Sequence, residues 1–599
     1  MAAKRPTLVR RLATRVLLSV AVLTSLLFVT LSAGAPHPVA GTASFSSESF
    51  SFTSYDGVVL HASLGWFGIL SARPLIVEDS PYAPDVGALN WSGDAFNYLE
   101  LQWRGTGLSA GSLDSTGTQD QQDLSDFLGW ACNQSWSNKR IGLYGFSASA
   151  IVVYNSMHLP LPCVQAASLM SGTVDLYRDL LYIGGVPSPV VGSAVEGLIL
   201  APWMENLITR ATTEPATIPA SVGGLATAPL QVGANMTEDA FWNERTFQGD
   251  PNRIPVLADD GFYDVEERGA VHAFLDTQGD GSHLIFMGAH DGNPAGVSPF
   301  PQYRAWFEHY LLDSPNGVDT QPTVQALLSN GSREQFLADN VTSLSGSGWP
   351  LAGTNWTDLY LSPAKSGSVQ SLNDGTLSLS PDPTGTTQSY PFIPSVASET
   401  DVHSIAAVSS DGVDQAANYF PQLTDMQLSG PTSLTYTTLP LSQAVDAVGP
   451  VGLDLYASST EPVTDLVAVV ADVWPDGTAY PVATGWLRTD YPNVDLSDYP
   501  NTNQPKTLVE NGEIVDPYNE FASQDPALPG TRREYHVEVL PIGNHFAAGH
   551  RIRLYILGTP GDMQGSPPGL DTLSLGGVSL SHVVFPTVGQ ASLSTALGR

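Results

Sequence analysis

Short apolar runs alternate with longer amphipathic segments between about residues 44 and 313. Two of the longer segments, DQQDLSDFLGWACNQ and VEERGAVHAFLDTQ, have the spacing of helices. The apolar runs are typical of buried strands, and each ends in a polar or small-residue loop: RPLIVEDSPY, YLELQWRGTG, RIGLYGFS, IPVLADDGFYD and HLIFMGAHDG. This alternation predicts an α/β domain over residues 44–315, with a mostly parallel sheet covered by helices on both faces.

The alternation is interrupted between about residues 170 and 248. In this region DLYRDLLYIGG, AVEGLILAPWMENLITRA and DAFWNERTF look helical. Functional groups in parallel sheets gather on the loops at the carboxyl ends of the strands. We therefore expect the helical insertion to cover those loops as a cap, with a further helical layer beside the sheet as the alternative.

Helical patterns fade beyond about residue 316, where short alternating strands are separated by Ser, Thr, Gly and Pro. Examples are GLDLYASS, DLVAVVADVW, YHVEVLPI and HRIRLYIL. This pattern predicts an all-β sandwich of the jelly-roll type over residues 345–599. The boundary between the domains is expected in the segment 313–349, whose polar composition suggests a linker.

Composition limits the class of partner. The chain has 599 residues, too many for one hydrophobic core, and Asp and Glu number 59 against 24 Lys and Arg. The resulting net charge of −35 disfavours nucleic acids and anionic membrane surfaces as partners, because both are polyanions.

Residues 1–35 have the layout of a secretory signal peptide. The basic start MAAKRPTLVRRLATR is followed by an apolar stretch that ends in small residues. The alternative is an uncleaved membrane anchor, and only in that case would the protein contact a membrane. Either way, the bulk of the chain is expected outside the cytoplasm, secreted or anchored.

Cys132 and Cys163 could pair in such an oxidising compartment, although two buried thiols fit the sequence equally well.

The segment KRIGLYGFSASAIVVYNSM places Ser147 between a strand-like run and a helix-like run, among small residues. A sharp strand-to-helix turn of this kind exposes a nucleophile and requires neighbours with almost no side chain. Ser149 stands where glycine is usual in such a turn. We predict that Ser147 is a nucleophile, with an ordinary strand-to-helix turn as the alternative.

A serine hydroxyl needs a neighbouring base to become nucleophilic. Asp264 and His290 each follow a predicted strand, so both are expected at the sheet edge that carries Ser147. The order serine, acid, histidine suits this architecture, with the imidazole taking the serine proton and the carboxylate orienting the imidazole. The rivals close in sequence are Asp259, Asp260, His272 and His283. Both rival histidines are interpreted as structural, because one falls inside a predicted helix and the other opens a strand at the opposite edge.

Several segments resemble, in order, the X-prolyl dipeptidyl-peptidase and cocaine esterase family of α/β-hydrolases. SFTSYDGVVLHASL resembles the opening hairpin of that family, EDSPYAP its Pro-Tyr loop, RGTGLSAG its Arg-Gly-Thr-Gly segment, and YHVEVLPIGNHFAAGHRIRLYI its jelly roll. The resemblance implies an α/β-hydrolase sheet with a helical cap insertion, followed by a jelly roll. It also implies Ser147 as nucleophile, Asp264 as acid and His290 as base, with the Tyr82 hydroxyl and the Ala148 backbone N–H as the oxyanion hole.

The chain departs from the family in two places. Ala148-Ser149 replaces an aromatic residue and a glycine, and Trp103 replaces the acidic residue that commonly precedes Arg-Gly. The glycines of RGTGLSAG are off the spacing of a dinucleotide-binding loop, and no His-Glu-x-x-His motif indicates catalytic zinc. We therefore expect no cofactor and no catalytic metal.

These features predict a secreted serine hydrolase that cleaves small ester or amide (acyl) substrates, or peptides, through a Ser-His-Asp triad and an acyl-enzyme. One alternative is an Xaa-Pro dipeptidyl-peptidase, which needs a carboxylate for the free amino terminus, such as Asp175, Asp179 or Glu205. Another is an inactive, hydrolase-like surface protein whose jelly roll binds glycans or protein, with Trp474 and Trp486 as candidate contacts.

Overall fold

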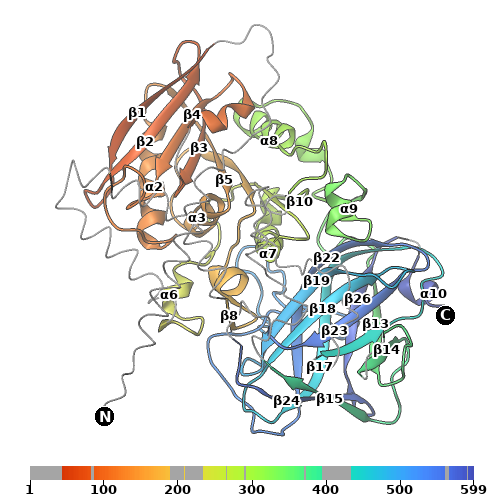
Figure 1. The fold of residues 1–599 in the computed structure, drawn as a ribbon. Coiled ribbons are helices and arrows are strands. Elements are labelled where there is room, and N and C mark those ends of the chain that lie inside the picture. Colours follow the sequence, from red (N-terminus) through yellow and green to blue (C-terminus); the bar gives the residue numbers. More distant parts are fainter. Residues whose placement is uncertain are drawn as a thin grey trace, which may run out of the picture.

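The protein has two main parts, an N-terminal sheet flanked by helices and a C-terminal body of strands (Figure 1). Most of the predicted cap and all of the predicted signal peptide lie outside the described residues. The computed structural model describes residues 44–82, 86–188, 208, 234–264, 266–288, 292–369, 373–393, 433–559, 565–589 and 591–598.

The N-terminal sheet has the strand order β1-β2-β4-β3-β5-β6-β9-β10-β11-β12. Every neighbouring pair from β4 to β11 is parallel, while β1, β2 and β12 are antiparallel to their neighbours. The predicted mostly parallel sheet is thus confirmed. Its strands are β1 (Phe45–Thr53), β2 (Val59–Phe67), β3 (Arg73–Ser80), β4 (Asn97–Gln102), β5 (Ser137–Phe146), β6 (Val164–Met170), β9 (Val256–Asp260), β10 (His283–Phe286), β11 (Val324–Ser329) and β12 (Val341–Gly346).

The side chains of the sheet enter two different cores, because neighbouring residues of a strand point to opposite faces. In β3, Leu75 and Val77 pack in the core that contains α2, α3 and α7, whereas Ile76 packs in the core that contains α8. Both faces are therefore covered, as the apolar runs predict. The helices on the two faces are α2 (Thr118–Cys132), α3 (Ala148–Ser156), α7 (Glu267–Thr277), α8 (Phe300–Leu312) and the 3₁₀-helix η2 (Val86–Ser92).

The sheet continues beyond residue 315, into the segment whose composition suggests a linker. β11 pairs with β10, and β12 pairs with β11 after the short helix α9 (Arg333–Leu337). Val324, Ala326 and Leu328 are buried on β11, which is the alternation of a strand with one covered face. The segment that the sequence pattern suggests is a linker thus contributes two strands to the N-terminal sheet.

The described part of the cap contains less helix than the sequence pattern predicts. DLYRDLLYIGG forms the one-turn π-helix η3 (Tyr177–Leu181) and then the hairpin of β7 (Tyr182–Ile183) and β8 (Val186–Pro187), while DAFWNERTF contains only α6 (Ala240–Asn243). The hairpin turns at Gly184, which has a positive φ of 58°. A Cβ there would lie 2.1 Å from the carbonyl oxygen of Trp486 in the C-terminal domain. This close approach, which helical periodicity does not reveal, favours the hairpin over a longer helix.

The C-terminal strands pair around a closed ring, in the order β13-β26-β17-β22-β19-β18-β23-β16-β14 and back to β13. Leu453, Leu455 and Ile556 are among the side chains that fill its core. The predicted all-β C-terminal domain is confirmed. Its elements are β13 (Asn355–Ser362), β14 (Asp374–Ser378), β15 (Thr386–Phe392), β16 (Ser433–Thr437), β17 (Val445–Ser459), β18 (Asp465–Val473), β19 (Ala479–Arg488), β20 (Leu508–Glu510), β21 (Glu513–Asp516), β22 (Arg533–Phe546), β23 (Arg551–Leu557), β24 (Gly569–Gly576), β25 (Ser579–Leu580), β26 (His582–Thr587) and α10 (Leu593–Ala596).

The jelly roll packs against the sheet edge that carries Asp264. A Cβ on Gly543 of β22 would lie 2.0 Å from the ring of Phe262, which follows β9. Phe262 in turn stacks on Phe286 of β10, with 4.2 Å between the ring centroids. The absence of a side chain at Gly543 therefore lets the two domains meet directly behind the candidate site.

A disulfide joins Cys132, the last residue of α2, to Cys163, which precedes β6. This answers the question of pairing that the sequence leaves open. The bridge ties together the two ends of the strand-turn-helix unit around Ser147. Within the ranges that the structure describes, no helix has the length and hydropathy needed to cross a bilayer.

Candidate active site

Ser147 occupies a sharp turn between β5 and α3, with φ 55° and ψ −123°. A positive φ is uncommon for a residue with a Cβ, and such strained residues cluster at functional sites. The turn is held by the Ser147 N–H, which donates to the Met170 carbonyl at 2.9 Å. The Ser147 carbonyl accepts from the N–H groups of Ala150 and Ile151 at 2.8 and 3.0 Å. The predicted strand-turn-helix setting of Ser147 is therefore present.

Small neighbours make this turn possible. A Cβ on Gly145 would lie 2.6 Å from the backbone nitrogen of Ala150, and a Cβ on Gly172 would lie 2.5 Å from the Ala150 Cβ. Ser149, at the position where the family has glycine, is fully buried beneath the turn. Its hydroxyl is accommodated next to Glu78 of β3, whose pKa burial raises to about 7, an effect that the Ser149 hydroxyl opposes.

Two hydrogen-bond donors lie beside the serine. The Ala148 backbone N–H, at the start of α3, donates to the Tyr82 hydroxyl at 3.3 Å. Tyr82 follows β3, the parallel neighbour of β5, and its own N–H donates to Ser80 Oγ at 3.3 Å. The phenolic hydrogen and the Ala148 N–H are therefore close enough to donate to one oxygen atom within reach of both, at the positive end of the α3 dipole.

Asp264 is fully buried in the loop that follows β9. Its Oδ2 accepts a hydrogen bond from Ser171 Oγ at 2.8 Å, and its N–H donates to the Gly261 carbonyl at 3.2 Å. β9 is separated from β5 only by β6, so Asp264 leaves the same edge of the sheet as Ser147. Sequence reasoning missed Ser171, because a serine after a strand in a Ser-Gly-Thr loop carries no distinguishing signal.

His290 lies outside the described residues, together with residues 289 and 291. The described residues on either side stand at the expected edge: the N–H groups of Met287 and Gly288 donate to the Asp260 carbonyl at 2.9 and 3.2 Å. Gly288 has a φ of 140°, and a Cβ there would lie 2.5 Å from the Gly292 carbonyl oxygen. Gly288 and Gly292, the described residues that flank this segment, therefore lie close together, with Gly288 beside the end of β9.

The two rival carboxylates have different surroundings. The Asp259 carboxylate accepts a hydrogen bond from the Tyr303 hydroxyl on α8. Burial raises the pKa of Asp259 to about 7, an effect that this hydrogen bond opposes. Burial also raises the pKa of Asp260 well above its usual range, and the neighbouring Asp264 raises it further. Asp259 thus belongs to the α8 side of the sheet, whereas Asp260 lies near Asp264.

The rival histidines have structural surroundings, as interpreted from the sequence. His272 lies on α7, where its Nδ1 contacts the Tyr499 hydroxyl of the C-terminal domain. Burial lowers the pKa of His272 to about 4. His283 opens β10 at the opposite edge of the sheet and packs against Trp306 of α8, with ring centroids 5.2 Å apart.

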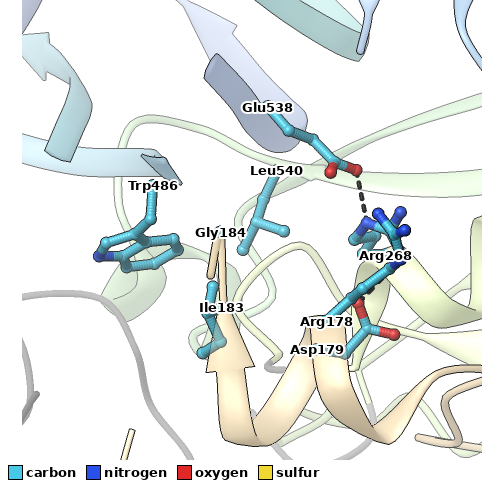
Figure 2. Close-up of a pocket in the computed structure, with 8 residues that line it drawn as sticks. All are labelled: Arg178, Asp179, Ile183, Gly184, Arg268, Trp486, Glu538 and Leu540. Carbon is cyan, nitrogen blue, oxygen red and sulfur yellow. Dashed lines mark hydrogen bonds and ion pairs between the residues drawn. The ribbon is translucent and has the colours of Figure 1, made fainter. Parts of the chain in front are cut away.

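A pocket lies where the cap hairpin, α7 and the jelly roll meet (Figure 2). Arg268 contacts both carboxylates of the lining: its Nη1 lies 3.2 Å from Asp179 Oδ1, and its Nε lies 2.5 Å from Glu538 Oε1. The remaining lining residues are Arg178, Ile183, Gly184, Trp486 and Leu540. Ile151 of α3, one helical turn after Ser147, packs in the same cluster as Ile183 and Leu540. The pocket therefore backs onto the helix that begins at the candidate nucleophile.

Two of the three cap carboxylates that are candidates for binding an amino terminus already pair with arginines. Asp175 Oδ2 lies 3.0 Å from Arg178 Nε, and Asp179 lies against Arg268. Burial is the main cause that raises the pKa of Asp175, to about 7. Glu205, the third candidate, lies outside the described residues.

Two family models match the chain and divide it as the fold does. The X-Pro dipeptidyl-peptidase (S15 family) model matches residues 70–291, and the model of the X-Pro dipeptidyl-peptidase C-terminal non-catalytic domain matches residues 316–590. The first match spans Ser147, Asp264 and His290, and the second begins before β11.

Individual relatives agree with these models. The chain is 22% identical over 539 residues to the cocaine esterase of Rhodococcus sp. (strain MB1 Bresler), covering 81% of this chain and 85% of the relative. It is 27% identical over 305 residues to a putative Xaa-Pro dipeptidyl-peptidase of Streptomyces avermitilis, covering 48% of this chain and 39% of the relative.

Solved structures share the two-domain fold. A CocE/NonD family hydrolase from Staphylococcus aureus is similar with a TM-score of 0.67 and 18% identity, covering 90% of this chain and 94% of its own. An α-amino acid ester hydrolase is similar with a TM-score of 0.66 and 17% identity, covering 94% of this chain and 100% of its own. With these matches over both domains, the chain belongs to the X-prolyl dipeptidyl-peptidase and cocaine esterase family of serine hydrolases.

Proposed function

We propose that Ser147 is the nucleophile, His290 the general base and Asp264 the acid that orients the base. Support comes above all from the backbone of Ser147, whose positive φ of 55° presents the side chain at the start of α3. The proposed oxyanion hole is formed by the Tyr82 hydroxyl and the Ala148 N–H, which are 3.3 Å apart.

In this mechanism Ser147 Oγ attacks the acyl carbon while its proton passes to His290. The carbonyl oxygen becomes negative and receives hydrogen bonds from Tyr82 and Ala148, which hold it in fixed positions. The protonated imidazole then gives its proton to the leaving alcohol or amine, and an acyl-enzyme remains. Water, deprotonated by His290, releases the acid and restores the serine. Asp264, itself held by Ser171, would stabilise the imidazolium in both halves of the reaction.

The substrates that we propose are small esters and amides rather than Xaa-Pro peptides. A dipeptidyl-peptidase must hold a protonated amino terminus, and an unpaired carboxylate in the cap is the simplest group for that purpose. Asp175 and Asp179 each face an arginine instead, which leaves them poor partners for an added cation.

A substrate panel tests both parts of this proposal. Wild type and Ser147→Ala should be compared on short acyl nitrophenyl esters and on Xaa-Pro anilides. We expect wild type to hydrolyse the esters with the higher kcat/KM, and Ser147→Ala to lose activity on both. Faster turnover of the anilides would identify a dipeptidyl-peptidase, and an active Ser147→Ala would reject Ser147 as nucleophile.

The alternative of an inactive glycan-binding protein loses one of its candidate contacts. Trp486 is only 2% exposed and packs in the core shared with the cap hairpin. Trp474 packs against Tyr480 and His550, with ring centroids 4.9 and 5.5 Å apart. Trp486 therefore offers no open face of the kind that stacks on sugars, which favours the enzyme.

We also propose that the protein is exported. The pairing of Cys132 with Cys163 supports this, because disulfides persist mainly in oxidising compartments. Cell fractionation followed by N-terminal sequencing of the mature chain is the test. Export with a new N-terminus near residue 36 is expected, and an intact N-terminus in the cytoplasmic fraction would contradict it.

A further inference from the structure

A row of ionisable side chains crosses the outer face of the jelly roll. Asp454 of β17 stands between two cross-strand partners, with His582 of β26 on one side and His536 of β22 on the other. The flanking residues Leu453 and Leu455 pack in the core of the sandwich. Because neighbouring side chains of a strand point to opposite faces, the side chains of the row point away from that core.

The hairpin formed by β20 and β21 covers this row. A Cβ on Gly452 of β17 would lie 2.1 Å from the carbonyl oxygen of Ile514 in β21, so the hairpin rests directly on the sheet. Glu513, the first residue of β21, reaches the row from above, with its Oε2 3.4 Å from His582 Nε2. Three strands far apart in sequence thus bring one imidazole and two carboxylates together.

His582 is oriented in the way that metal-binding histidines are. Its Nδ1 lies 2.7 Å from the Leu580 carbonyl oxygen, which can only accept, so Nδ1 carries the hydrogen. The lone pair of Nε2 is then directed into the cluster. The residue is only 6% exposed, and Nε2 makes no hydrogen bond among the described residues. The ring of Tyr360 stacks on the imidazole at 5.4 Å and fixes its plane.

The spacing of the three donor atoms fits a shared cation better than direct hydrogen bonds. His582 Nε2 lies 3.6 Å from Asp454 Oδ2 and 3.4 Å from Glu513 Oε2. Charge-assisted N–H···O bonds are about 2.7–2.9 Å long. Ligands held at about 2.0–2.2 Å in a tetrahedron around Zn²⁺ are separated by roughly 3.3–3.6 Å. The two observed separations are those of such a tetrahedron.

The charges of the cluster agree with a cation. Asp454 Oδ1 is occupied by His536 Nδ1, which leaves Oδ2 directed at His582. Within the described part of the chain, the ion-pair partners of Asp454 and Glu513 are histidines, with no lysine or arginine among them. Two carboxylates and a neutral imidazole would supply one nitrogen and two oxygen ligands, a set that Zn²⁺ accepts.

A second group, His272, Asp516 and Glu538, also brings three donors together but does not suit a cation. Arg268 Nε lies 2.5 Å from Glu538 Oε1, and its fixed positive charge stands where a metal would need to be. His272 is already in contact with Tyr499. The comparison makes the jelly-roll cluster the better candidate.

We propose that His582, Asp454 and Glu513 form a Zn²⁺ site that fastens the β20–β21 hairpin to the jelly roll. The site lies in the C-terminal domain and is independent of the proposed triad. Glu513 is 41% exposed, so the metal enters from the hairpin side and a water completes the coordination.

The test is titration of the full-length, chelator-treated protein with Zn²⁺ by calorimetry, together with the thermal shift that Zn²⁺ causes. Wild type should bind one equivalent and unfold at a higher temperature with Zn²⁺ present. Glu513→Gln and His582→Gln should weaken binding at least about tenfold, because even outer partners of metal ligands contribute that much. Glu513→Gln decides the question if His582→Gln does not fold, because Glu513 is partly exposed on a hairpin.

His545→Gln is the matched control. His545 Nδ1 lies 2.6 Å from Asp446 Oδ1, and the two residues face each other across β17 and β22, as Asp454 and His536 do. Among the described residues, no third ligand joins this pair. The control should bind Zn²⁺ as wild type does. The proposal is overturned if wild type binds no Zn²⁺, or binds it no more tightly than Glu513→Gln does.

Discussion

The proposed oxyanion hole makes a prediction for Tyr82→Phe, which removes one hydroxyl and keeps the ring. The ring packs against the core beside α2 and α3, so phenylalanine should preserve the fold. The hydroxyl is 3.3 Å from the Ala148 nitrogen, close enough for both groups to donate to one oxygen. After the change only the Ala148 N–H would remain to stabilise the negative oxygen.

The magnitude follows from the loss of one of two donors. Removing one oxyanion donor typically costs about 10²–10³ in kcat, or about 3–4 kcal/mol of transition-state stabilisation. The hydroxyl's ground-state hydrogen bond is worth only about 1 kcal/mol, so stability should change little. Because the negative oxygen exists only in the transition state and the intermediate, kcat should fall while KM stays nearly constant.

Steady-state kinetics on a short acyl nitrophenyl ester provide the assay. Tyr456→Phe is the control, because it removes a phenolic hydroxyl that donates to Glu534 in the jelly roll. The control should keep wild-type kcat. If Tyr82→Phe retains kcat within about threefold of wild type while Ser147→Ala is inactive, Tyr82 is not an oxyanion donor and the reasoning fails.

The remaining predictions concern the acid, the disulfide and pH. Ser171→Ala removes the 2.8 Å hydrogen bond to Asp264 and should lower kcat about tenfold or more, whereas Ser171→Thr keeps a hydroxyl and should restore much of it. Equal kcat in both variants would show that the bond does not position the acid. Replacing both Cys132 and Cys163 by serine opens a loop with a sequence separation of 31 and should lower the free energy of unfolding by about 3–4 kcal/mol; an unchanged urea midpoint would contradict this. Burial raises the pKa of Asp259 to about 7 and of Asp571 to about 6, so the folded state binds these protons more tightly than the unfolded chain. The contribution of these two carboxyl groups to the free energy of unfolding is complete below about pH 4 and is lost as pH rises through 6–7. The thermal midpoint should therefore be higher at pH 5 than at pH 8, and the reverse order would contradict the assignment.

The sequence was most informative where the local pattern and the final packing agree. The helices predicted from DQQDLSDFLGWACNQ and VEERGAVHAFLDTQ correspond to α2 at Thr118–Cys132 and α7 at Glu267–Thr277. Both have an apolar stripe that packs on the sheet. The turn at Ser147 was also predictable, because the strained backbone requires the small residues around it.

Prediction failed where distant contacts determine the local structure. The hairpin at Gly184 depends on the Trp486 backbone, 302 positions later in the numbering, which periodicity within the cap segment cannot reveal. In β11, the short run that includes Val324 and Leu328 lies in a polar context, and its pairing with β10 is non-local. The proposed zinc ligands likewise come from three strands and form no contiguous motif, so a search for zinc sequence patterns passes over them.

The proposed function depends above all on the hydroxyl of Ser147, which performs the nucleophilic attack. The most direct measurement is peptide mapping by mass spectrometry after reaction of the full-length protein with a fluorophosphonate. We expect one phosphonyl adduct, on the peptide that contains Ser147, with loss of esterase activity in proportion to labelling. An adduct on another residue, or esterase activity that survives complete labelling of Ser147, would contradict it.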